Sequence, residues 1–256
     1  MAYIHIKNLY KSYAGSTGEN NQVLENLNIE VKKGEFVSVF GPNACGKTTL
    51  LNIIAGLIDF DKGSVTIDGK EPSKSRVGFV FQDYSDSLFP WFKNIDNIAF
   101  SLDYSFGSKK QKHERIRNYV KEMGLEELPL DKYPYQCSGG QQQLVALIRE
   151  LIYAPDVLLL DEPFASLDYD RRISQQEYLL TTWERTQSTI IFVSHELDEA
   201  VLLADRLILL SQRPAKVADI YDINLPRPRN IELYEQEAFF KLKVPILHKF
   251  REVIGK

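Results

Sequence analysis

The chain has 256 residues, of which 44% are hydrophobic and 26% are charged, and these values are ordinary for a globular protein. The 35 acidic side chains outnumber the 31 basic ones, so the formal net charge is −4. This composition excludes a fibrous or disordered chain, and it offers no general attraction to nucleic acid or anionic lipid, so we expect no nucleic-acid partner.

The two cysteines, Cys45 and Cys137, are too few for a disulfide framework and fit a reducing compartment. The N-terminus lacks the apolar core of a signal peptide, and no apolar run approaches the roughly 18 residues needed to cross a bilayer. We therefore expect any role at a membrane to require docking to another chain.

The N-terminal part predicts strands around a polar loop. Residues 4–6 and 23–31 alternate between apolar and polar side chains, and residues 14–21 between them are mostly small or polar. Residues 35–40 form a short apolar run that ends at Gly41, and apolar side chains recur at helical spacing over 47–57. A glycine-rich loop is therefore expected between a strand and a helix.

This loop matches the pattern Gly-x4-Gly-Lys-Thr, which binds phosphates in many proteins. Gly41 and Gly46 let the backbone wrap closely around negative charge, and the following helix adds its positive N-terminal end. Lys47 supplies a charge for the β- and γ-phosphates, and the Thr48 hydroxyl can ligate Mg²⁺. The predicted ATP contacts of this loop are Gly41, Pro42, Asn43, Ala44, Cys45, Gly46, Lys47, Thr48 and Thr49.

Strands are predicted again over 64–67, before the turn Asp68-Gly69, and over 77–81, before Gln82. Residues from about 92 to 150 look mostly helical, with one amphipathic helix over 109–123 and another starting after Gly140.

The remaining elements alternate between strand and helix, which predicts a largely parallel α/β sheet. The expected elements are strands over 157–160, 189–193 and 207–210 and a helix over 196–203. Residues 211–256 contain four prolines and are interpreted as an appendage.

Two adjacent carboxylates, Asp161 and Glu162, follow the strand predicted over 157–160. Burying both inside a sheet would be costly, so we expect them at its carboxyl edge, where open α/β sheets bind ligands. Asp161 can then hold Mg²⁺, and Glu162 can polarise the water that attacks the γ-phosphate. The alternative is a solvated turn, which the nearby phosphate loop disfavours.

The run Cys137-Ser138-Gly139-Gly140-Gln141 resembles the signature motif of the ATP-binding cassette (ABC) ATPases. It lies between the phosphate loop and the acidic pair, which is the order in that family, and the resemblance covers about residues 3–215. It implies an α/β fold: a P-loop NTPase with a RecA-like core, an N-terminal antiparallel β subdomain and an inserted helical signature subdomain at about 88–150. Residues 1–215 would be the ATPase domain, and 216–256 a C-terminal appendage of unknown role.

The resemblance also implies roles for single residues. Tyr13 matches the aromatic that stacks on adenine, although an ordinary strand-end tyrosine is the alternative. Gln82 matches the glutamine that touches Mg²⁺ and the attacking water, and Asp168, in Ala165-Ser166-Leu167-Asp168, matches a loop that contacts a second subunit. His195 matches the histidine that senses the γ-phosphate. The predicted catalytic residues are Lys47, Gln82, Glu162 and His195, and the predicted Mg²⁺ ligands are Thr48, Gln82 and Asp161.

In this family the signature residues bind the nucleotide held by the other subunit of a head-to-tail dimer. The resemblance therefore implies that Ser138, Gly139, Gly140 and Gln141 contact the ATP of a second ABC ATPase subunit. Both cysteines would then approach the same ATP, which suggests that alkylating either thiol blocks turnover; the alternative is that they are merely small residues.

Phe89-Pro90-Trp91 and Ser211-Gln212-Arg213-Pro214 resemble one bacterial import subgroup, which serves nitrate, sulfonate, taurine, bicarbonate or thiamine-precursor uptake. Its members work on the cytoplasmic face of the cell membrane with a membrane-spanning permease and, indirectly, an extracytoplasmic solute-binding protein. An exposed aromatic groove beside Gln82 would suit such docking, whereas the same aromatics could instead be core. The alternatives are a soluble ABC ATPase, such as an iron–sulfur assembly factor, and a non-catalytic regulatory cassette.

Overall fold

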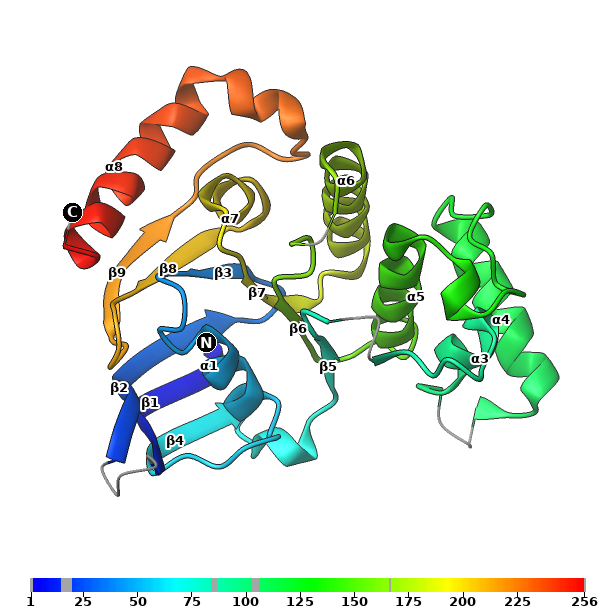
Figure 1. Ribbon diagram of the computed structural model, residues 1–256, viewed down its shortest axis with the longest axis horizontal. Helices are drawn as coiled ribbons and strands as arrows, with labels where there is room; N and C mark the ends of the chain where they lie inside the picture. Colours follow the sequence, from blue (N-terminus) through cyan, green and yellow to red (C-terminus); the bar gives the residue numbers. More distant parts are fainter. Residues whose placement is uncertain (1, 15–19, 84–86, 103–105, 166, 256) are drawn as a thin grey trace.

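The computed structural model describes residues 2–14, 20–83, 87–102, 106–165 and 167–255. Two sheets lie side by side with helix α1 (Lys47–Ile54) between them, and a group of helices lies beyond one edge of the larger sheet (Figure 1). This arrangement confirms the predicted α/β class with an N-terminal antiparallel sheet.

The smaller sheet is antiparallel and has the order β2-β1-β4. The central strand, β1, pairs with both of its neighbours. Asp68 and Gly69, which follow β4, form the predicted tight turn, with φ angles of 50° and 72°. The three strands are β1 (Ala2–Ala14), β2 (Asn20–Lys32) and β4 (Lys62–Ile67).

The larger sheet has the order β5-β6-β7-β3-β8-β9, and all its strands are parallel except β9. Its inner strands are mostly apolar because both faces are covered: Val37 and Val39 face α1 and the small sheet, whereas Phe36 packs with helices on the other side. The strands are β3 (Phe36–Phe40), β5 (Val77–Val80), β6 (Val157–Asp161), β7 (Thr189–Val193), β8 (Arg206–Leu210) and β9 (Val217–Asp222).

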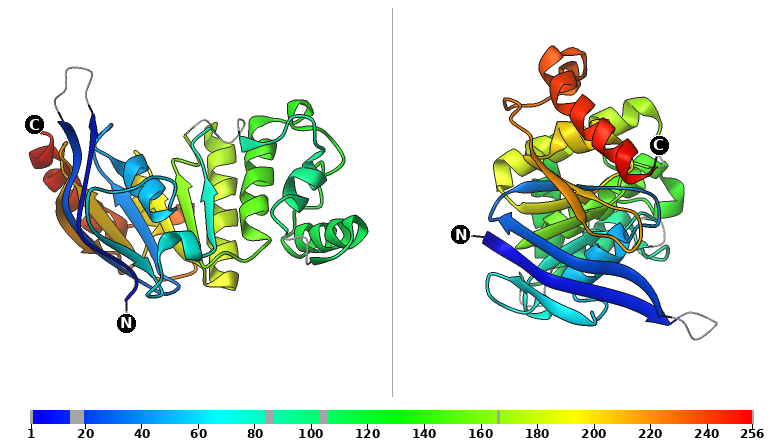
Figure 2. Two further views of the ribbon diagram at one scale, coloured as in Figure 1. Left: turned by 90° about the horizontal axis from the view of Figure 1, so that it is seen from below. Right: turned by 90° about the vertical axis from the view of Figure 1, so that its left-hand side faces the viewer.

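Three helices cover the face of the larger sheet that points away from α1 (Figures 1 and 2). They are α6 (Tyr169–Thr186), α7 (Leu197–Leu203) and α8 (Glu237–Val253), the last preceded by the 3₁₀ turn η4 (Ile231–Glu235). The sequence patterns predicted α7 but neither α6 nor α8.

The remaining helices lie beyond the β5 edge of the larger sheet (Figures 1 and 2). They are α3 (Asn94–Ala99), α4 (Lys109–Glu122) and α5 (Gly139–Leu151). Helices α3 and α4 are farthest from the sheet, and α5 lies against the edge strand β5 (Figures 1 and 2). Ser108 begins α4 with a capping box, in which its side chain accepts from the Gln111 backbone N–H and the Gln111 side chain accepts in return.

The chain beyond residue 215 continues directly into the larger sheet, since β9 pairs with β8 as its edge strand. The division of the chain at that residue remains a prediction. Helix α1 is shorter than predicted, because it ends at Ile54 and leaves Leu57 57% exposed. None of the described helices combines the length and apolar character needed to span a membrane.

Candidate functional site

The glycine-rich loop lies between β3 and α1, as predicted. Gly46 has a φ of 125°, and a Cβ there would come within 2.8 Å of side-chain carbons of Val23 and Leu24, so glycine is required on both counts. Lys47 is the first residue of α1 and is buried. Its Nζ donates to the carbonyl of Gly41 at 3.0 Å, which keeps the ammonium group at the loop.

A cleft of about 450 Å³ opens over this loop. It joins the loop to residues that follow three neighbouring strands, because the carboxyl ends of parallel strands meet at one edge of the sheet. The cleft is lined by Asn43, Ala44, Gly46, Lys47, Thr48, Thr49, Gln82, Glu162, His195 and Arg213. The four residues predicted to be catalytic therefore share one cleft, and Arg213 adds a positive charge that the sequence patterns did not single out.

Asp161 ends β6 beside this cleft and is 3% exposed. Burial raises the pKa of its carboxyl group, the Thr48 hydroxyl hydrogen-bonds to it, and its Oδ1 is a buried oxygen with no hydrogen-bond partner among the described residues. A carboxylate and a hydroxyl are the hard oxygen donors that Mg²⁺ prefers, so this pair fits that ion. The described residues contain no group of three His, Cys, Asp or Glu side chains that could hold a metal alone, so a Mg²⁺ ion at Asp161 and Thr48 would need further ligands, such as Gln82, phosphate oxygens or water.

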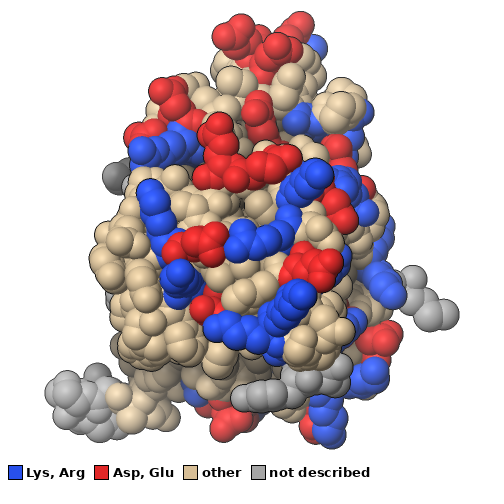
Figure 3. All heavy atoms as spheres, turned by 90° about the vertical axis from the view of Figure 1, so that its right-hand side faces the viewer, with Lys and Arg blue, Asp and Glu red and all other residues tan. Residues whose placement is uncertain are grey.

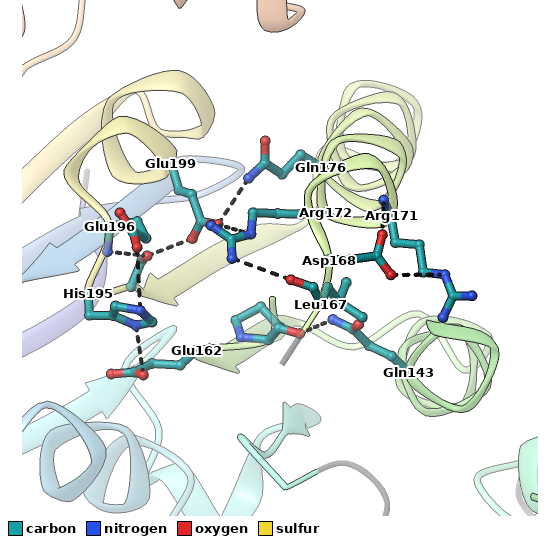
Figure 4. A network of polar contacts seen from close by, with 12 residues as sticks. Gln143, Glu162, Leu167, Asp168, Arg171, Arg172, Gln176, His195, Glu196 and Glu199 are labelled. Carbon is teal, nitrogen blue, oxygen red and sulfur yellow. Dashed lines mark hydrogen bonds and ion pairs between the residues drawn. The ribbon is translucent and has the colours of Figure 1, made fainter. Parts of the chain in front are cut away.

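Glu162 occupies a left-handed conformation, with a φ of 46°, that turns its side chain into the cleft beyond the sheet. His195 Nδ1 lies 3.0 Å from Glu162 Oε2 and its Nε2 lies 3.6 Å from Glu196 Oε1 (Figure 4). The loop after Glu162 is also tied to α5, because Gln143 Nε2 donates to the Pro163 carbonyl. A carboxylate so placed can orient a water molecule, with the imidazole beside it.

The signature residues lie in a second cleft of about 360 Å³. Ser138 caps α5, and Gly139 is the first residue of that helix. This cleft is lined by Ser138, Gly140, Gln141, Leu144, Asp170, Arg171, Ser174 and Gln175, and it shares no lining residue with the first cleft. One chain therefore keeps its signature residues apart from its own phosphate loop.

Asp168 and Tyr13 also lie outside the first cleft. Asp168 caps α6, since its Oδ1 accepts from the backbone N–H of Arg171 at 3.2 Å (Figure 4). Tyr13 is 43% exposed near the end of β1, with Lys11 Nζ 5.0 Å from its ring centroid. Its contact with adenine stays a prediction, and Ser166 of the predicted subunit-contact loop lies outside the described residues.

The two thiols have different surroundings. Cys45 is 1% exposed, and burial raises the pKa of its thiol, so it presents neither an accessible nor a readily ionised sulfur. Cys137 is partly exposed and its Sγ lies 3.1 Å from Asn94 Nδ2. The alkylation hypothesis therefore loses its physical basis at Cys45.

The predicted aromatic groove lies on the surface. The Phe89 ring packs against Trp91 and Phe100 with centroids 5.6 and 4.7 Å apart, and those two partners are 68% and 65% exposed. A groove of about 440 Å³ runs between Phe81, Phe89 and Phe100, and a second groove shares Phe81 and reaches Gln82. These aromatic residues therefore form an outer surface that borders the first cleft.

Charges of both signs are interspersed on the face formed by the helical group (Figure 3). Many of them are paired: Arg117 lies 3.1 Å from Asp131, and Lys109 lies 2.8 Å from Asp96. The charges on this face are therefore mixed in sign (Figure 3).

Comparisons with known proteins agree with this geometry. Residues 24–165 match the family model described as "ABC transporter". The aliphatic sulfonates import ATP-binding protein SsuB of Bacillus cereus is 40% identical over 96% of this chain and 95% of its own. The bicarbonate transport ATP-binding protein CmpC of Synechococcus elongatus is 37% identical over 96% of this chain, which corresponds to 38% of that longer protein.

Among solved structures, the dimeric structure of the bacterial ABC transporter cassette MJ0796 superposes with a TM-score of 0.76. It is 30% identical, and the match covers 87% of this chain and 100% of that one. The same cassette has been solved as a dimer in a post-hydrolysis state bound to ADP and Pi.

Proposed function

Because this chain belongs to the ABC transporter family, we propose that it hydrolyses MgATP on the cytoplasmic face of a membrane to drive the import of a small anion through a permease. As a member of this family, the chain is an ATP-binding subunit with ATPase activity. Two relatives support the choice of solute class, since one imports aliphatic sulfonates and the other transports bicarbonate, and both solutes are small anions. The extracytoplasmic solute-binding protein is the partner that would select among such anions.

The observation that carries the proposal is the convergence of Lys47, Glu162 and His195 in one cleft. Lys47 and the N–H groups of its loop would hold the β- and γ-phosphates. Asp161 and Thr48 would hold Mg²⁺, which neutralises charge on those phosphates.

Glu162 would orient a water molecule for attack on the γ-phosphorus, and His195 would contact the γ-phosphate beside it. The new bond joins the water oxygen to phosphorus while the bond to the β–γ bridging oxygen breaks, so ADP and inorganic phosphate leave. The Arg213 guanidinium, on the same cleft, would offset negative charge on the phosphates.

The separate cleft at Ser138 supports a head-to-tail pair, in which each signature would close over the ATP held by the other chain. Glu162→Gln should lower the rate of hydrolysis by about 100-fold or more and leave nucleotide binding intact. Light scattering behind a sizing column should then detect a dimer in MgATP.

Lys47→Ala is the matched control, because loss of the phosphate contact should leave that variant monomeric in MgATP. A Glu162→Gln protein that stays monomeric in saturating MgATP would contradict the head-to-tail arrangement.

The aromatic groove supports docking to a membrane protein, because it is exposed and shares Phe81 with the groove at Gln82. Affinity purification from gently solubilised native membranes, followed by mass spectrometry, should recover a polytopic permease. Recovery of scaffold or ribosomal proteins without any permease would contradict the importer assignment and leave the ATPase chemistry untouched.

The solute class is tested by uptake of labelled sulfonates and labelled bicarbonate in cells that lack this gene. Restoring the wild-type gene, but not the Glu162→Gln form, should restore uptake of one of these anions. Normal uptake of both in the deleted cells would contradict the proposed solute class.

A further inference from the structure

The C-terminal segment, defined as residues 223–253, holds helix α7 at several points. Arg229 Nη1 donates to the Ala204 carbonyl at 2.7 Å, just beyond the end of α7. Lys243 of α8 lies 2.5 Å from Asp198 in the first turn of α7. The C-terminal segment therefore contacts α7, the helix that follows His195, at both of its ends.

The first turn of α7 also carries a buried carboxylate, Glu199, which is 6% exposed. The Ser194 hydroxyl donates to its Oε2 at 2.6 Å and Gln176 Nε2 donates to its Oε1 at 3.1 Å (Figure 4). Arg172 Nε lies 3.7 Å from the same Oε1. Burial raises the pKa of this carboxyl group, whereas the Ser194 hydroxyl and the Arg172 guanidinium favour its charged form.

Ser194 connects Glu199 to the backbone around His195. Its Oγ accepts from the Glu196 N–H at 2.9 Å while donating to Glu199, so the residues on both sides of His195 are fixed to one carboxylate. The imidazole itself is 40% exposed, and it reaches Glu162 in the cleft at 3.0 Å. Its direction therefore depends on the backbone that Glu199 holds.

Tyr234 extends this network into the C-terminal segment. Its hydroxyl donates to Gln176 Oε1 at 3.5 Å, and the ring of Phe239 in α8 packs edge-on against it with centroids 5.1 Å apart. The contacts run from α8 and η4 through Gln176 to Glu199, and from there to His195.

We propose that Glu199 is a positioning residue for His195 and that the C-terminal segment sets the rate of ATP hydrolysis through it. The inference rests on the proposed function, because it assigns control of the same cleft. Loosening the segment should lower kcat and leave KM for ATP within about twofold, since the described polar contacts of Glu199 go to Ser194, Gln176 and Arg172 and not to the loop that would hold the phosphates.

Three variants test two of the features described above, the buried carboxylate of Glu199 and the ion pair between Lys243 and Asp198. Glu199→Ala should lower kcat by about tenfold or more, whereas Glu199→Gln, which keeps an oxygen for Ser194, should stay within about threefold of wild type. Lys243→Ala should lower kcat about two- to fivefold. Lys241→Ala is the matched control, because that lysine lies on the same helix, pairs only with Glu237 among the described residues and is 72% exposed; its kcat should match wild type.

A second readout does not depend on hydrolysis. The chain contains four histidines, so imidazole signals of ¹⁵N-histidine-labelled protein can be resolved by NMR and assigned by substitution. Lys243→Ala should shift the His195 signals but not those of His5 or His113, which lie on β1 and α4. Lys241→Ala should shift none of these three.

Unchanged His195 signals in Lys243→Ala would overturn the inference, whether or not kcat falls, because the segment would then act only as packing. An equal fall of kcat in Lys241→Ala would overturn it as well. If the wild-type protein proves to lack ATPase activity, the proposed function fails, and the NMR comparison still decides whether the C-terminal segment positions His195.

Discussion

At Asp161, the chemistry proposed for the site conflicts with stability. The carboxyl group is buried and its pKa is raised by that burial, so holding it ionised at neutral pH destabilises the protein without a cation. A bound cation would offset this cost, which gives a physical reason for an acidic residue at the end of an otherwise apolar strand.

Asp161→Asn should therefore raise the melting temperature of the nucleotide-free protein at pH 7, by about 2–4 °C, while abolishing Mg²⁺-dependent hydrolysis. The folded-state pKa lies above the ordinary value near 3.9, so the difference should vanish below about pH 3.9 and develop as the pH rises through the raised pKa. Thermal unfolding at several pH values checks this. A less stable variant at pH 7 would show that the carboxylate is already compensated within the chain.

Ala44 lies in the glycine-rich loop with a φ of 57°, a conformation that strains a residue with a Cβ. Ala44→Gly should raise the free energy of unfolding by about 1 kcal/mol, measured by urea denaturation. Ala146→Gly, inside α5, is the control with the opposite expected effect. It should lower the free energy of unfolding, because glycine weakens a helix interior. A destabilised Ala44→Gly protein would mean that the loop relies on the alanine methyl group.

Among the elements, the connection after β9 depends on one buried cation. Arg229 is 5% exposed and donates to four backbone carbonyls, those of Leu202, Ala204, Ile223 and Leu225. Burial lowers its pKa to about 10, which still leaves the guanidinium charged at neutral pH. It therefore replaces the regular hydrogen bonds that the end of α7 and this connection lack.

Arg229→Met should cost about 3–5 kcal/mol of unfolding free energy, because four carbonyls lose their donor inside the protein. Arg251→Met, at an exposed position of α8, should cost less than about 0.5 kcal/mol. Equal stabilities of the two variants, measured by chemical denaturation, would contradict this assignment.

The elements that sequence patterns predicted are those with clear apolar periodicity. The strands of the larger sheet up to β8 are buried on both faces, so each reads as a short apolar run between turns. Helix α6 was not predicted because Gln175, Gln176 and Thr182 occupy its buried face, where apolar side chains would mark a helix. Helix α8 contains Pro245, which reads as a helix breaker.

The residues of the candidate site also fall into two groups, those that the sequence predicted and those that only the structure shows. Lys47, Asp161 and Glu162 follow from motif spacing, because phosphate and metal chemistry restricts the residue types. Arg213 was recognised only as part of a subgroup motif and Glu199 was not predicted, because their places in the site come from contacts with residues distant in sequence, such as Gln176 for Glu199. Such pairings exist only after the sheet has formed.

In the whole molecule, the aromatic groove borders the first cleft and is the proposed docking surface for a permease. The Trp91 ring packs against Phe89 of this groove and is 68% exposed, and a tryptophan that becomes buried commonly dominates the energy of an interface. Trp91→Ser should weaken binding to the cognate permease at least about tenfold, measured by retention on the detergent-solubilised complex.

Phe240→Ser is the control, since this 49% exposed ring lies on α8, outside the groove. Both variants should melt within about 2 °C of wild type, because neither ring is part of the core. Equal permease retention by the two variants would exclude the groove as the docking surface.

The two clefts also have a consequence for inheritance. In the proposed head-to-tail pair, the phosphate loop and the signature of one chain would serve different ATP molecules, so a defective copy would inactivate a site that it shares with its normal partner. In a cell that makes normal and defective chains in equal amounts, random pairing leaves only about a quarter of the pairs wholly normal. A Ser138 or Glu162 allele would then behave as a dominant one, even though its protein folds and pairs normally.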